Sequence, residues 1–104
     1  MIPQNGVTMH PGKLLRELLE ENGISQGRLA EHIGVPIQRI NLIVNEKRGI
    51  TADTAWRLAA AFGQSARFWM GLQTMHDLTA NRIQEMIPPI VELQPIPQAQ
   101  AMPA

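Results

Sequence analysis

Apolar residues recur at spacings of three and four along residues 11–86, which is the period of amphipathic α-helices. Short polar stretches that contain glycine, proline or asparagine divide this region into segments. The pattern therefore predicts an all-α protein, folded as a five-helix bundle. The helices are expected over residues 11–22, 26–33, 36–45, 52–61 and 66–86.

The residues at the ends of these segments support the division. Ser25, Thr51 and Ser65 each precede a helix, and their hydroxyl groups are suited to accept a hydrogen bond from a free N–H of the first turn. Gly34 follows the second helix, where a left-handed residue commonly ends a helix. These signals place the helix boundaries independently of the apolar period.

The composition changes after residue 86. Five prolines interrupt residues 87–104, so this stretch is predicted to be a proline-rich, flexible tail. Within it, residues 90–93 could form a short strand if they found a partner. We expect residues 1–8 to be a flexible N-terminal segment and residues 9–86 to be the folded domain.

The third segment, GVPIQRINLIVNEKR at residues 34–48, is the most informative stretch of the chain. Ile40, Ile43 and Val44 fall on one face of the predicted helix, whereas Gln38 and Asn41 lie elsewhere on its circumference. Together with the preceding helix and its glycine turn, this segment forms a helix-turn-helix pattern at about 25–45. Small or apolar residues occupy the positions where the two helices must pack, namely Leu29, Ala30, Ile33, Gly34, Val35, Ile40 and Ile43.

The last two helices carry three large aromatic residues. Trp56, Phe68 and Trp69 could be stacking platforms for single-stranded nucleic acid, but their spacing among leucines and alanines favours a role in the core. The fifth helix has more apolar residues than one inward stripe needs, so part of its surface is expected to bury against a second copy of the chain. The residues expected in this dimer interface are Phe68, Trp69, Leu72, Met75 and Leu78.

The composition argues against several other functions. The 104-residue chain has no net charge and a pI near 6.8, which is unsuited to a protein that coats nucleic acid non-specifically. It has no cysteine, which removes disulfides, thiolate metal sites and cysteine nucleophiles. His10, His32 and His76 lack the spacing of metal ligands, and we expect no enzyme, metal or cofactor. Without a membrane-spanning run or a signal peptide, the chain is expected in the cytoplasm.

The run LLRELLEENGISQGRLAEHIGVPIQRINLIVNEKRGITADTAWRLAAAFGQSARFWMGLQ resembles the lambda-repressor-like, or Xre-type, helix-turn-helix family. More narrowly, HPGKLL, SQGRLA, KRGITADTAWRLAAAFG and FWMGLQ resemble the HigA/VapI antitoxins of bacterial toxin–antitoxin pairs. The resemblance covers about residues 9–80. It implies a sequence-specific DNA-binding antitoxin that neutralises a cognate mRNA-cleaving toxin and represses its own operon.

The resemblance also implies which residues would contact double-stranded operator DNA. In Xre-like docking the third helix enters the major groove, where glutamine and asparagine can read adenine, arginine can read guanine, and apolar side chains can meet thymine methyl groups. The expected base-reading residues are Ile37, Gln38, Arg39, Asn41 and Leu42. The expected phosphate-binding residues are Gln26, Asn45, Lys47 and Arg48.

The partner implied by the resemblance is a HigB-like ribonuclease toxin, which needs a basic surface to hold RNA. Glu17, Glu20 and Glu21 cluster on the first helix, and we expect this acidic face to contact the toxin. Residues 1–8 or the proline-rich tail are the alternative contacts. A homodimer formed through the fifth helix would read two half-sites about one turn of DNA apart.

Two positions depart from the family pattern. Glu46 stands where the family usually has a glycine suited to left-handed backbone, and it adds a negative charge beside the expected phosphate contacts. Gly27 lies inside the second helix, where glycine costs about 1 kcal/mol relative to alanine. Two alternatives stay open. One is a stand-alone transcriptional regulator without a toxin, and the other is a protein-binding adaptor that has lost its DNA affinity, which Glu46 and the neutral net charge would suit.

Overall fold

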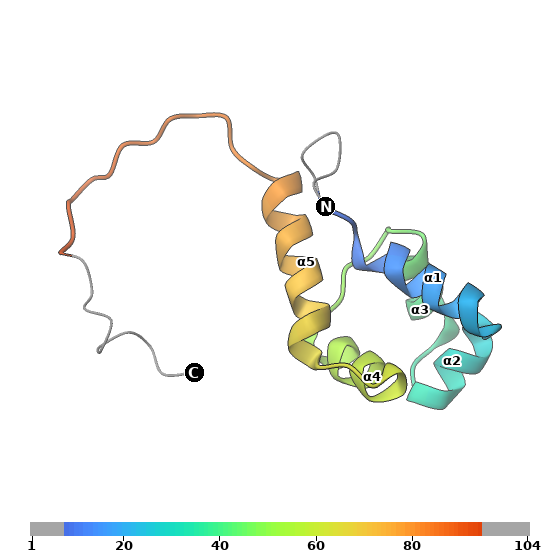
Figure 1. Ribbon diagram of the computed structural model, residues 1–104. Coiled ribbons are helices and arrows are strands. Elements are labelled where there is room, and N and C mark those ends of the chain that lie inside the picture. The colour runs from blue at the N-terminus through green and yellow to red at the C-terminus, as the bar shows by residue number, and fades with distance from the viewer. Residues whose placement is uncertain (1–7, 95–104) are drawn as a thin grey trace.

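The computed structural model describes residues 8–94 and contains five helices (Figure 1). They are α1 (Pro11–Asn22), α2 (Gln26–Ile33), α3 (Ile37–Val44), α4 (Ala52–Phe62) and α5 (Ala66–Ala80). α3 packs against both α1 and α2, while α5 packs along α4 and also contacts α1. The predicted all-α, five-helix architecture is confirmed.

The helix caps form as the sequence predicts. Ser25 Oγ accepts a hydrogen bond from the Arg28 N–H at 3.0 Å, and Ser65 Oγ accepts one from Phe68 N–H at the same distance. Gly34 ends α2 with φ 75°, a left-handed conformation that glycine adopts without steric cost. These caps set where each helix begins and ends.

One core joins the helices. Its most deeply buried large side chains include Leu15 of α1, Ile40 and Ile43 of α3, Leu58 of α4 and Trp69 of α5, all at 0% exposure. Burial of each aliphatic side chain contributes about 1.5–3 kcal/mol. Because α3 supplies two of these residues, its outer face is presented on a firmly packed element.

Trp56 is not a core residue, contrary to the prediction, because its side chain is 70% exposed. The inward stripe of α4 consists of Thr54, Ala55, Leu58 and Ala59, and position 56 lies between these residues on the outside of the helix. Phe68 is also exposed, at 42%. Of the three predicted core aromatics, only Trp69 is buried.

α5 ends at Ala80 and not at Met86 as predicted. Asn81 ends the helix, since both its backbone N–H and its side-chain amide donate to the carbonyl of Asp77. The chain then leaves the bundle in an extended course (Figure 1). Residues 90–93 are exposed there and pair with no strand among the described residues, whereas residues 1–7 and 95–104 lie outside the described part.

Thr8 differs from the flexible segment predicted for residues 1–8. Its backbone N–H donates to Thr79 Oγ1 of α5 at 3.0 Å, and the two hydroxyl groups lie 3.3 Å apart. The chain is therefore attached to α5 before α1 begins. Among residues 8–94, no helix has the length and apolar content that crossing a lipid bilayer requires.

Candidate nucleic-acid interface

The turn between α2 and α3 fixes the angle of the predicted reading helix. The Val35 N–H donates to the Ala30 carbonyl at 3.0 Å, and the Val35 side chain is buried. Pro36 follows in an extended conformation (φ −64°, ψ 144°) and is the N-cap of α3. α3 thus begins at Ile37, one residue later than expected, and the helix-turn-helix arrangement is present.

The outer face of α3 carries four of the five predicted base-reading residues. Gln38 and Asn41 are exposed, as are Ile37 at 47% and Leu42 at 37%. The opposite face is buried in the core. Amide groups and apolar side chains are therefore available together on one rigid surface, the combination that direct base reading in a major groove requires.

Arg39 differs from these four because it is held by α4. Its NH1 lies 3.0 Å from Asp53 Oδ2, and its side chain is only 25% exposed. The same oxygen accepts from Arg57 Nε at 3.0 Å, and Arg57 NH1 donates to the Ile33 carbonyl at 2.7 Å. The hydrogen bond from Arg57 is the main cause that lowers the pKa of Asp53. This cluster joins α3, α4 and the end of α2.

A row of amide side chains runs from the start of α2 to the end of α3. Asn41 Nδ2 donates to Gln26 Oε1 at 3.3 Å, and Asn45 Nδ2 donates to the Asn41 carbonyl at 3.0 Å. Lys47 and Arg48 follow in the exposed loop after α3. The structure therefore gathers the predicted phosphate-binding residues beside the predicted reading face.

Arg16 of α1 belongs to this surface, although no sequence signal singled it out. Its NH2 group donates to the Val44 carbonyl and to Asn45 Oδ1, each at 3.3 Å. With Gln26 and Asn41 it lines an open hollow of ≈ 580 Å³. Arg16 was not predicted because only the packing of α1 across the end of α3 brings it there. Asp53 was not predicted as a partner of Arg39, because only the folding of the chain brings α4 near enough to α3 for the two side chains to meet.

The N-terminal turn of α1 lies directly against the end of α3. A Cβ atom added to Gly12 would overlap the carbonyl oxygen of Ile43. Only glycine allows this approach of two backbones. α1 therefore supports the last turn of α3 through Gly12 and Arg16.

Glu46, which stands where the resemblance predicts glycine, adopts a left-handed conformation with φ 60°. The N–H of Glu46 donates to the Ile43 carbonyl at 2.9 Å and that of Lys47 to the Leu42 carbonyl at 2.8 Å. This is the Schellman arrangement that ends many helices, with glutamate where glycine is preferred. The turn keeps its geometry, but at a cost in backbone strain.

Glu46→Gly is expected to raise the free energy of unfolding by about 1 kcal/mol, because it relieves the left-handed conformation of an L-residue. Glu46→Ala is the matched control, since it removes the same charge and keeps the strain. Urea unfolding of the two variants separates the effects. Equal stability of the glycine and alanine variants would show that position 46 is not strained.

The sequence profile of the Helix-turn-helix family matches residues 15–69. Virulence-associated protein I of Dichelobacter nodosus is 51% identical over 71 residues, which are 67% of this chain and 66% of that protein. Antitoxin HigA-1 of Vibrio cholerae is 40% identical over 77 residues, covering 71% of this chain and 72% of the relative. The chain thus spans just under two thirds of the virulence-associated protein.

Solved structures of similar proteins include complexes with DNA. The Pseudomonas aeruginosa antitoxin HigA with the higBA promoter is 41% identical and has a TM-score of 0.71, covering 80% of this chain and 98% of its own. Another structure from Pseudomonas aeruginosa, a complex with a 28-base-pair operator, is 44% identical, with a TM-score of 0.70 and coverage of 71% of this chain and 82% of its own.

Proposed function

Because this chain belongs to the Xre-type helix-turn-helix family, among its HigA-like antitoxins, we propose that it is a sequence-specific DNA-binding antitoxin. It binds the operator of its own operon, represses transcription and neutralises a cognate mRNA-cleaving toxin. In this proposal the protein acts by binding and not by catalysis. Its site of action is the cytoplasm, where the operator DNA lies.

The exposed amide face of α3 is the observation that carries this proposal. Gln38 and Asn41 extend from a helix whose other face is fixed in the core, so their amides reach base edges without disturbing the fold. A B-form major groove is about 12 Å wide and admits an α-helix. Arg39 stays a candidate for guanine, since its bond to Asp53 engages only one of its nitrogens.

The residues around α3 would set the register on the DNA. Lys47 and Arg48 bring positive charge to the exit loop, and Arg16 brings a further guanidinium from α1. Gln26 lies at the start of α2, where amide groups and the helix dipole favour phosphate. These residues would bind the sugar-phosphate backbone of the DNA and would not distinguish one base sequence from another.

Fluorescence anisotropy with labelled promoter DNA tests the DNA-binding part of the proposal. The chain should bind a duplex from its own promoter much more tightly than a shuffled duplex of the same composition. Equal affinity for the two duplexes would contradict sequence-specific binding, and no binding to either duplex would favour the adaptor alternative.

We propose further that the chain is a homodimer joined by the outer face of α5. Phe68, Met75 and Leu78 are 42%, 51% and 65% exposed and share one side of the helix. Trp69 is not part of the proposed interface, contrary to the prediction, because it is completely buried in the core of its own chain. Leu72 is partly buried against the same core, so its role at an interface is smaller.

Leu78→Glu should convert the dimer into a monomer, since it places a charge within the proposed apolar contact. Ala60→Glu on the exposed side of α4 is the matched control and should leave the dimer intact. Light scattering at tens of micromolar reports the mass. A wild-type chain that is monomeric there would contradict the dimer.

The acidic face of α1 is our proposed toxin contact. Glu17, Glu20 and Glu21 are all exposed and are spaced to lie on neighbouring turns of α1. Glu20 also lines the hollow beside Arg16, so this face reaches the edge of the DNA-binding surface. Coexpression of the neighbouring toxin gene with a triple-lysine variant of these glutamates tests the contact, with Glu31→Lys on α2 as control. Retained co-purification of the folded triple variant would exclude this face.

A further inference from the structure

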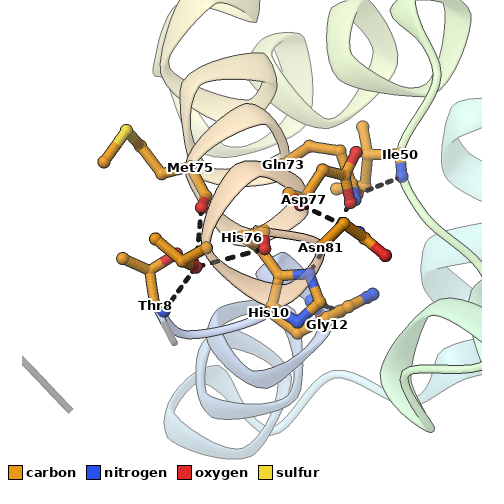
Figure 2. A network of polar contacts seen from close by, with 10 residues as sticks. Thr8, His10, Gly12, Ile50, Gln73, Met75, His76, Asp77 and Asn81 are labelled. Atoms are coloured by element: carbon orange, nitrogen blue, oxygen red, sulfur yellow. Dashed lines mark hydrogen bonds and ion pairs between the residues drawn. The ribbon is translucent and has the colours of Figure 1, made fainter. Parts of the chain in front are cut away.

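The residues just before α1 are fastened to α5 by a polar network (Figure 2). His10 is the N-cap of α1 and only 6% exposed, and its Nδ1 accepts a hydrogen bond from the Gly12 N–H at 2.9 Å. The ring of His76 from α5 meets it edge to face, with centroids 4.9 Å apart. Two residues earlier, Thr8 is bonded to Thr79. We call this set of contacts the His10 joint.

The His10 joint is continuous with the support of α3. Gly12, whose N–H is held by His10, is also the residue that approaches the Ile43 carbonyl too closely for any side chain. One turn further along α1, Arg16 holds the Val44 carbonyl. The position of the first turn of α1 therefore determines where the last turn of α3 can lie.

We propose that His10 is a positioning residue for operator binding, and that its neutral imidazole holds α1 in the place that α3 requires. Protonation of His10 would release this hold and weaken binding as the pH falls. The inference rests on the proposed DNA-binding function.

The chemistry of the imidazole gives the direction of the effect. A neutral histidine has one nitrogen that accepts, whereas an imidazolium donates from both nitrogens. After protonation, Nδ1 of His10 would face the Gly12 N–H as a second donor, and the cap would be lost. The first turn of α1 has no room to move toward Ile43, so any displacement that follows takes it away from α3.

The surroundings of His10 favour its neutral form. Burial is the largest cause that lowers its pKa from 6.5, and the nearby His76 adds to it, while Glu46 and Asp77 act in the opposite direction. These groups belong to α5 and to the loop after α3. Nδ1 of His76 is buried without a hydrogen-bond partner in residues 8–94, and the Asp77 carboxylate 3.7 Å away accepts from Gln73.

The sign of the pH dependence follows from this lowered pKa. Well above pH 6.5 the imidazole is neutral whether or not the joint is formed, so the joint is intact. Below that pH the released histidine takes up a proton more readily than the joined one, and acid therefore favours release. An ordinary surface histidine has the opposite effect, since its positive charge strengthens binding to phosphates.

Operator affinity measured at about pH 7.5 and about pH 5.5, at constant ionic strength, tests the inference. The operator affinity of the wild-type chain should fall about tenfold or more from the higher to the lower pH. This is the effect expected when each protomer loses the free energy of one helix cap. His10→Asn keeps a side chain that caps helices but does not titrate in this range, so its affinity should change much less. His32→Asn replaces an exposed histidine of α2 and should lose at least as much affinity in acid as the wild type does.

A second measurement needs neither a variant nor DNA. In ¹⁵N-labelled wild-type protein, the amide resonances of Gly12 and Val44 should shift with one common midpoint below pH 6.5. Wild-type affinity that stays constant or rises in acid would overturn the inference, as would a His10→Asn variant that loses affinity as the wild type does. Absence of specific binding at pH 7.5 would instead contradict the proposed function. The amide resonances would then still test whether protonation of His10 opens the His10 joint.

Discussion

Replacement of both Gln38 and Asn41 by alanine is expected to weaken operator binding by about 30-fold or more, because each good bidentate contact to a base is worth about 1–3 kcal/mol. Both side chains are exposed on the outer face of α3. Neither supports the core, so the free energy of unfolding should change little. The loss should therefore fall on the operator and not on unrelated DNA.

Arg48→Ala is the comparison that separates base reading from phosphate binding. Arg48 is exposed in the loop after α3, where its charge can attract DNA phosphates whatever the base sequence. Its loss should weaken binding to operator and shuffled DNA alike and reduce the salt slope by about one. If the Gln38→Ala, Asn41→Ala variant kept the sequence preference of the wild type, α3 would not be the reading helix.

Gly12→Ala is expected to lower the free energy of unfolding by about 3 kcal/mol or more, the upper end of the range for overpacking, because the backbone that it meets cannot yield. The added Cβ meets the backbone carbonyl of Ile43 and not a movable side chain. α1 must then separate from α3, which also withdraws Arg16 from the Val44 carbonyl. Denaturant unfolding followed by tryptophan fluorescence measures the loss.

Gly27→Ala is the matched control, since it also adds one methyl group to a helical glycine. The nearest atom to its Cβ would be Ile37 Cδ1 at 3.5 Å, an ordinary van der Waals contact. This variant should be as stable as the wild type or more stable by up to about 1 kcal/mol. Similar losses in both variants would show that the contact between α1 and α3 is not as close as described.

The helices could be predicted from sequence because their signals are local. The apolar period and the caps at Ser25, Thr51 and Ser65 depend only on neighbouring residues, and four helices start and end within about two residues of the expected positions. The end of α5 could not be predicted, because residues 81–86 keep helical character in sequence but have nothing to pack against. Trp56 was wrongly predicted in the core, because the prediction relied on its hydrophobicity and not on its position on the outer side of α4.

The candidate site could be predicted only as far as it lies on one helix. The outer face of α3 follows from its buried face, so Gln38 and Asn41 were found without a structure. Arg16 and Asp53 were not, since each contacts a residue more than a dozen positions away that only packing brings near. His10 caps α1 locally, but only the packing of α5 brings its ring against His76. Glu46 lies between the two cases, because a departure from the family pattern pointed to the left-handed residue that the structure contains.

Methylation interference on the promoter of the chain's own operon tests most directly whether a dimer reads DNA through α3. Methylation of guanine N7 marks the major groove, and methylation of adenine N3 marks the minor groove. We expect guanine N7 methylation to block binding in two half-sites whose centres lie about 10 base pairs apart, one for each α3 of the dimer. Interference confined to adenine N3, or no cluster of interfering positions in the promoter, would contradict operator reading by α3.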